Sequence, residues 1–251
     1  MNLNNKTNKN KFIMVLAALL VVSAFLHLFS LADIPGGFFK DESAIGYNAW
    51  SISQTGKDEY GVDYPLFFRC FENYHEPVTV YYLVPLIKFF GPTKTVVRLP
   101  GACFNILASV AFGLLCWQLR RNRWLSLAAG FFFSVLPWIF PLSRITMAGY
   151  MPMLLGISGG LFCLLRGLSK RSVWYMVGAA AGLTFAMYAH NCARPTVVAF
   201  MIMFLVAYNV NLIKRWKIFS IFCGLSVLIM LPMGIAILNN RNTMTSRFNQ
   251  I

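Results

Sequence analysis

Apolar runs alternate with short polar or basic segments along most of the chain, and several runs are long enough to cross a membrane. The first run, 12–32, is interrupted only by His27 and two serines. A helix of about 20 apolar residues spans the roughly 30 Å hydrocarbon core of a bilayer, so we predict an uncleaved signal anchor here. Further spans are expected over 96–119, 124–142, 147–168, 173–189, 196–212 and 218–238.

The short apolar run 78–90 decides the topology. As a helix it would reach only about 20 Å, and Lys88 shortens its apolar part. If it crossed the membrane, the basic cluster 120–123 would face outward. If it lies along the outer interface, that cluster faces the cytoplasm together with the basic residues at 170–171 and 214–217. The positive-inside rule selects the interfacial or re-entrant helix.

The predicted fold class is therefore an all-α membrane protein, a polytopic helical bundle of about seven transmembrane helices in the cell membrane. We expect a disordered cytoplasmic tail over 1–11 and a transmembrane domain over 12–238. The extracytoplasmic first loop, 33–94, belongs to that domain and carries interfacial helices. The tail 239–251 is expected outside the membrane and to be truncated. Two G-x-x-x-G spacings favour close helix packing, at 156–160 and 178–182.

The amino-acid composition is typical of a protein that is surrounded by lipid. Hydrophobic residues make up 58% and charged residues only 12%, against about 25% charged in soluble domains. The net charge of +14 comes from basic residues between apolar runs, which is typical of membrane topology rather than of nucleic-acid binding. All eight acids lie within 33–76, so carboxylate chemistry is confined to the first outer loop.

The cysteines indicate neither a metal site nor a redox motif. The six cysteines contain no C-x-x-C pair, and four fall inside apolar runs, where cysteine packs as a small hydrophobe. Cys70 and Cys192 are expected on the same side of the membrane, and a disulfide between them stays open. We predict no metal ligands and no cofactor; the sequence also leaves the assistance of a divalent metal open.

Asp41 and Glu42 begin an amphipathic helix that Gly56 would end. One interpretation is structural: Asp41 caps the helix, and Glu42 complements its dipole. The other is catalytic: one of the two carboxylates is a general base whose pKa is raised near the lipid interface. The residues alone leave both interpretations open.

Three arginines, Arg98, Arg144 and Arg194, are expected on the same outer side as these acids. Each could be an interfacial anchor whose head reaches the lipid headgroups. Each could instead contact a lipid phosphate, because a guanidinium binds phosphate through two hydrogen bonds. Three arginines on the side that the positive-inside rule disfavours indicate an anionic ligand there.

Five further outer residues are candidates for substrate binding. His75 and Glu76 precede a proline at a helix start, which would explain them structurally, although His75 could also relay a proton. Tyr82 and Tyr188 are typical of the interfacial aromatic belt, and aromatic faces also bind sugars. His190 is either a packing residue or an outer-site residue.

An ordered set of motifs resembles a known family. After one span and a "DE" pair come "HEPVTVYYLVPLIKFFG", "VVRLPGACFNIL", "LPWIFPLSRI" and "GLTFAMYAHNCARPTVV". This order resembles the polytopic GT-C glycosyltransferases of the protein-mannosyltransferase and aminoarabinose-transferase type, family 39 and its relatives. The likeness covers roughly residues 12–238.

The resemblance implies transfer of a sugar from a polyprenyl-phosphate donor to a lipid, glycan or protein acceptor on the extracytoplasmic face. It implies that Asp41 is the base with Glu42 beside it, that His75 and Glu76 line the site, and that Arg144 lies near the donor phosphate. Many family members carry an acid shortly after the "SR" of this motif, where this chain has "SRITMAGYMP".

Two other functions stay open on the sequence. One is a transporter or flippase of a lipid-linked saccharide, and the other is a non-catalytic fragment or assembly subunit. A transporter more often carries polar residues in mid-span and repeated halves. Here the polar residues gather on one side, which favours the glycosyltransferase.

Overall fold

The computed structural model describes residues 3–70, 73–213 and 215–239, and these are almost entirely helical. A two-stranded antiparallel sheet joins β1 (Phe68–Cys70) to β2 (Asn73–His75). The helices are α1 (Leu3–Leu28), α2 (Lys40–Thr55), α3 (Pro77–Tyr81), α4 (Leu83–Phe90), α5 (Lys94–Arg120), α6 (Arg123–Ser134), α7 (Ile139–Ser143), α8 (Tyr150–Lys170), α9 (Val173–Ala189), α10 (Ala193–Ile213) and α11 (Trp216–Asn239).

Among the described residues, four helices are long and apolar enough to cross a membrane: Asn8–Leu28 within α1, then α5, α8 and α11. The prediction of an all-α, multi-pass membrane protein is therefore confirmed at this level. The apolar helices α9, Ala193–Tyr208 within α10, and Pro77–Phe90 are shorter. The count of seven spans stays a prediction.

The span expected over 124–142 is not one continuous helix, because the chain breaks there into α6 and α7. Pro137 lies between them; it has no N–H to donate, and it disfavours helical geometry at the preceding Leu136. The helix at 78–90 is also divided, at Tyr82. Pro85 occupies the first turn of α4, where a missing N–H is tolerated.

The termini differ from expectation in one respect. Because α1 begins at Leu3, residues 3–11 are helical rather than disordered. The predicted outer tail 239–251 lies outside the described residues apart from Asn239, the last residue of α11.

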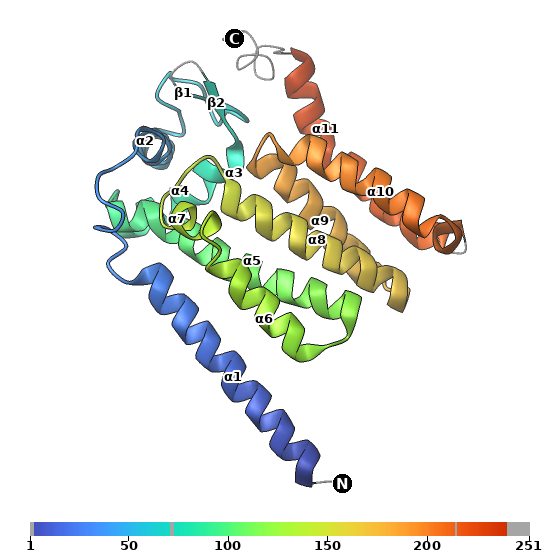
Figure 1. Cartoon of the computed structure of the whole chain (residues 1–251). Coiled ribbons are helices and arrows are strands. Elements are labelled where there is room, and N and C mark those ends of the chain that lie inside the picture. Colours follow the sequence, from blue (N-terminus) through green and yellow to red (C-terminus); the bar gives the residue numbers. More distant parts are fainter. Residues whose placement is uncertain (1–2, 71–72, 214, 240–251) are drawn as a thin grey trace.

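Glycines bring α8 and α9 into close contact, as their G-x-x-x-G spacing predicted. A Cβ atom added at Gly156 would come within 2.5 Å of the Gly182 carbonyl oxygen, and one at Gly160 within 2.8 Å of Leu183. Buried Leu164, Met176 and Leu183 extend this contact into a core that also includes residues of α10 and α11. Figure 1 shows these four helices side by side.

A buried polar cluster joins α1 to α5 and α6. His27 is fully buried; one ring nitrogen lies 2.7 Å from the Ser23 carbonyl and the other 2.7 Å from the Asn105 side-chain nitrogen. The Ser23 hydroxyl donates to the Ser134 hydroxyl at 3.2 Å. Paired polar side chains hold helices together in an apolar surrounding, so His27 is a packing residue.

Charged residues segregate to the two ends of the bundle. The N-terminal end of α1 and the turns α5–α6, α8–α9 and α10–α11 lie toward one end, and α2, β1, β2 and α3 lie toward the other (Figure 1). The first end carries the basic residues of 120–123, 170–171 and Arg215, and the second carries the acids of the first loop. We call these the basic end and the acidic end.

Candidate functional site

The acidic end contains a fully buried ion pair between α5 and α2. Arg98 Nε donates to Glu42 Oε1 at 2.8 Å and Arg98 Nη2 to Glu42 Oε2 at 3.0 Å. Both side chains are 0% exposed. This two-point geometry between guanidinium and carboxylate is the strongest form of such a pair.

The other donors of Arg98 hold the connection between α1 and α2. They donate, at 2.9–3.2 Å, to the backbone carbonyls of Leu31, Ala32, Pro35 and Gly37. A guanidinium has five N–H groups, and together with Glu42 these carbonyls engage all of them. Arg98, predicted to bind substrate, therefore organises the loop that precedes α2.

Arg144, which follows α7, has a similar structural surrounding. It donates to the carbonyls of Leu26, in the last turn of α1, and of Phe29, directly after α1, and through Nε at 3.1 Å to the Ile34 carbonyl. The last carbonyls of a helix have no partner within the helix and attract cations. Desolvation and, to a smaller extent, the charge of Arg98 lower the pKa of Arg144. Arg144 thus caps α1 from a distant part of the chain.

Glu42 also shapes the start of α2. It occupies the third helical position and accepts from the Phe39 N–H at 3.0 Å and from the Thr146 N–H at 3.3 Å. The N-cap residue is Phe39, so Asp41 is not the cap. Gly56 ends the helix in left-handed geometry at φ +74°, as predicted. The structural interpretation of the acidic pair therefore applies to Glu42.

Asp41 has a different surrounding from its neighbour. It is partly exposed, and no hydrogen bond or ion pair engages its carboxylate among the described residues. Burial first, and then the nearby charges of Asp41 and Glu59, raise the pKa of Cys70 on β1 to about 12. That influence places the Asp41 carboxylate near β1. All six cysteines, which lie within the described residues, are free thiols, so Cys70 and Cys192 are not joined.

A second ion pair joins Glu76, before α3, to Arg194 in α10. Arg194 Nη2 lies 2.6 Å from Glu76 Oε2, and the side chains are 11% and 10% exposed. The guanidinium also lies over the Phe67 ring, 5.5 Å from its centroid. Arg194 Nε and Asn191 Oδ1 are buried without a hydrogen-bond partner among the described residues. A buried unpaired donor is costly, so this Nε–H is a candidate contact for a ligand.

His190 and His75 lie in the same region. The His190 ring stacks on Tyr150 at 4.3 Å, and its Nδ1 accepts from the Cys192 N–H at 3.1 Å. His75 is buried in β2, opposite Phe68. Contacts with neighbouring residues therefore fix both histidines. In the sequence, His75 directly precedes Glu76, and His190 lies four residues before Arg194.

The two candidate tyrosines make packing contacts. The Tyr188 hydroxyl donates to the Ile229 carbonyl at 2.9 Å and accepts from the Met233 N–H at 3.2 Å. These two backbone groups lie one helical turn apart in α11, on either side of Pro232. The Tyr82 ring packs edge-on against Phe104 at 5.1 Å.

An apolar cavity of about 380 Å³ lies beside the second ion pair. Its lining includes Pro77 and Val78, which directly follow Glu76, together with Tyr81, Tyr188 and Ile229. Its walls are suited to a hydrocarbon chain rather than to a polar ligand. The acidic end thus has charged groups next to an apolar cavity.

Sequence reasoning identified the residues of this region but not their partners. Glu42 and Arg98 are 56 positions apart, and Glu76 and Arg194 are 118 apart; no local pattern reports such pairing. Asn191 carried no signal except its place between His190 and Arg194. Over the described residues, no group of three or more metal-ligating side chains forms.

No family model, no curated protein and no solved structure matches this chain. The likeness to GT-C glycosyltransferases therefore rests on the sequence motifs.

Proposed function

We propose that the protein is a membrane glycosyltransferase that moves a sugar from a polyprenyl-phosphate donor to an acceptor on the extracytoplasmic face. One observation carries this proposal. The acidic end combines an unengaged carboxylate, an arginine with a spare buried donor, and an apolar cavity. These are the groups needed to activate a hydroxyl, stabilise a leaving phosphate and hold a prenyl chain.

Asp41 is the proposed general base. Its carboxylate is partly exposed and has no partner among the described residues, so an acceptor hydroxyl can reach it. Glu42 is excluded from this role by its bonds to Arg98 and the backbone. Because a polyprenyl phosphate is already a good leaving group, the reaction needs a base more than it needs an acid.

Arg194 is the proposed contact of the donor phosphate. Its Nη2 is held by Glu76, and its Nε–H remains available. A positioned donor at the place where negative charge develops stabilises the transition state. Arg98 and Arg144 support this arrangement indirectly by fixing the loop before α2.

The cavity next to Pro77 is the proposed place for the first part of the prenyl chain. It begins one residue from Glu76, so a chain bound there would bring its phosphate near Arg194. Tyr188 and Tyr81 line the same cavity. Since the walls are apolar, burial of the chain would supply binding free energy at about 25 cal/mol per Å².

The test is sugar transfer from a radiolabelled polyprenyl-phosphate sugar in membranes that contain the protein. We expect Asp41→Asn to reduce transfer by roughly 10²–10⁴-fold, the usual contribution of a general base. Arg194→Lys keeps a cation for Glu76 but removes the Nε–H, and should reduce transfer by roughly 10²-fold. The matched control is Asp63→Asn, an exposed acid of the same loop, which should leave transfer unchanged.

Three results would contradict the proposal. Transfer that persists in Asp41→Asn would remove the base. Movement of the intact lipid across the membrane without cleavage would identify a transporter. Absence of cleavage by the wild-type chain, together with a co-purifying partner that restores it, would identify an assembly subunit.

A further inference from the structure

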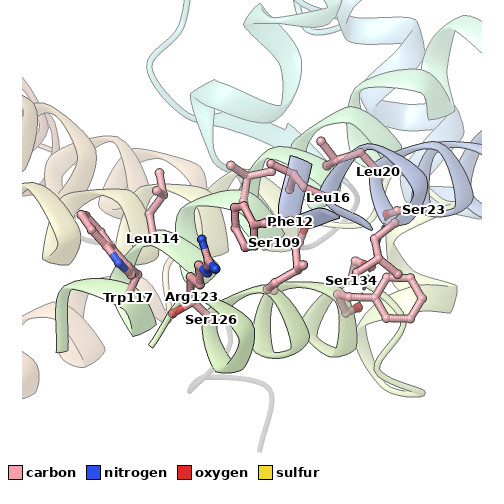
Figure 2. Close-up of a pocket in the computed structure, with 16 residues that line it drawn as sticks. Phe12, Leu16, Leu20, Ser23, Ser109, Leu114, Trp117, Arg123, Ser126 and Ser134 are labelled. Carbon is pink, nitrogen blue, oxygen red and sulfur yellow. Dashed lines mark hydrogen bonds between the residues drawn. The ribbon is translucent and has the colours of Figure 1, made fainter. Parts of the chain in front are cut away.

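A larger cavity, of about 470 Å³, lies between α1, α5 and α6 and shares no residue with the candidate site. Figure 2 shows Trp117 and Arg123 toward one end of it and Ser23 and Ser134 toward the other. On α1 the cavity extends from Phe12 to Ser23. It therefore runs along the helix axis, as a lipid chain in the bilayer would.

The walls of this cavity are hydrocarbon along its length. Leu16 and Leu20 of α1 and Leu114 of α5 line it (Figure 2). Its serines satisfy their hydroxyls within the protein: Ser126 donates to the Asn122 carbonyl at 2.7 Å, and Ser23 donates to Ser134. A ligand inside this space would therefore meet no polar group that requires a partner, which suits an acyl chain.

Arg123 provides a positive charge at the end nearest the basic loop. Its guanidinium lies over the Phe12 ring at 5.4 Å and over the Trp124 ring at 5.7 Å. Within the described part of the chain it makes no hydrogen bond and no ion pair. The sequence has no acid beyond Glu76, so the neutralising anion for Arg123 is expected from outside this part of the protein.

The other charges at this end have the same sign. Lys9 and Lys11 are exposed within the turn of α1 that precedes Phe12, and Arg120 and Arg121 precede Arg123. Basic pockets between transmembrane helices bind anionic lipid headgroups, and each cation near the surface contributes about 1 kcal/mol. The positive charge of this end and the apolar cavity next to it together fit an amphiphilic ligand with an anionic headgroup.

We propose that this cavity binds an anionic phospholipid, with the phosphate at Arg123 and one acyl chain along α1 toward Ser23. This lipid is distinct from the donor of the proposed reaction, because its head lies at the basic end and the donor phosphate at the acidic end. The inference rests on the cavity and on Arg123, and it does not depend on the protein being an enzyme.

The test measures lipid retention by native mass spectrometry of the purified protein in detergent, titrated with phosphatidylglycerol or phosphatidylcholine. We expect the wild type to retain phosphatidylglycerol preferentially. Leu114→Trp fills the cavity and should abolish retention of both lipids. Its matched control is Leu107→Trp, on the same helix and 53% exposed but outside the cavity, which should retain lipid like the wild type.

A second pair of variants tests the proposed contact between Arg123 and the lipid headgroup. Arg123→Gln should lower the preference for phosphatidylglycerol about fivefold, corresponding to one cation, while chain binding persists. Arg171→Gln, an exposed cation at the same end, should preserve the preference. Inorganic phosphate at millimolar concentration should not displace the lipid, because the acyl chain supplies part of the affinity.

Several outcomes would overturn the proposal. Equal retention by Leu114→Trp and the wild type would show that the lipid binds elsewhere, as would an equal loss in Leu107→Trp. Displacement by inorganic phosphate would identify a free anion as the ligand. Retention of no lipid by a wild-type dimer would indicate that a second copy of the chain covers the cavity.

Discussion

At the scale of single residues, two adjacent carboxylates of α2 occupy opposite surroundings. Glu42 points into the protein and pairs with Arg98, and both side chains are fully buried. Asp41, one position earlier, is partly exposed and unengaged among the described residues. A helix turns by 100° per residue, which is enough to separate a structural acid from a candidate catalytic one.

This contrast predicts opposite effects of the same chemical change. Glu42→Gln leaves Arg98 buried without its counter-charge, and removal of one partner from a buried pair costs about 3–5 kcal/mol. Asp41→Asn removes no bond in the described structure and should change stability by less than about 0.5 kcal/mol. Thermal unfolding in detergent would measure both variants. Equal destabilisation by the two would refute the division of roles.

The candidate site could be predicted from the sequence only in part. The confinement of all acids to one loop correctly indicated where carboxylates would meet arginines. The pattern did not indicate that Arg98 and Arg144 would bind backbone carbonyls of the α1–α2 connection. That outcome depends on the three-dimensional path of residues 29–37, which no periodicity encodes.

At the scale of elements, Gly149 sets the approach of α8 to α9. It precedes α8 at φ +75°, and a Cβ atom there would lie 1.9 Å from the Ala189 carbonyl oxygen at the end of α9. The next residue, Tyr150, stacks on His190 directly after α9. A side chain at position 149 would therefore displace the stacked pair near the candidate site.

Gly149→Ala should destabilise the protein by roughly 2–4 kcal/mol, from left-handed backbone geometry and steric overlap together. Gly224→Ala is the matched control, because a Cβ atom in the middle of α11 meets nothing within 4 Å and alanine favours the helix. The midpoint of thermal unfolding would separate the two variants. A stable Gly149→Ala variant would show that the junction is not close-packed.

The sequence predicted the existence of helices better than their continuity. Hydropathy identified the apolar segments, and the preference of glycine for helix ends identified Gly56 as the end of α2, because both features are local. It missed the break between α6 and α7, since an apolar run continues through Pro137 and hydropathy ignores the missing N–H. The same limit applies at Tyr82, where two short helices replace one.

At the scale of the whole molecule, the proposed function depends on how charged residues are distributed between the two ends of the bundle. Basic residues lie at the turns of one end, and the described acids lie in α2, in the loops on either side of it and at Glu76 directly after β2, at the other end; Figure 1 shows these two ends. From the positive-inside rule we expect the acidic end, with Asp41 and Arg194, to lie outside the cytoplasm. A polyprenyl-linked donor on that face requires this orientation.

The most direct test is the sidedness of single cysteines in intact cells, labelled with a membrane-impermeant maleimide. In a chain with the other cysteines replaced, Cys192 and Asp63→Cys report the acidic end, and Arg171→Cys reports the basic end. All three positions are exposed. We predict that Cys192 and Asp63→Cys react in intact cells, and that Arg171→Cys reacts only after permeabilisation. Labelling of Arg171→Cys from outside, or of Cys192 and Asp63→Cys from different sides, would contradict the account.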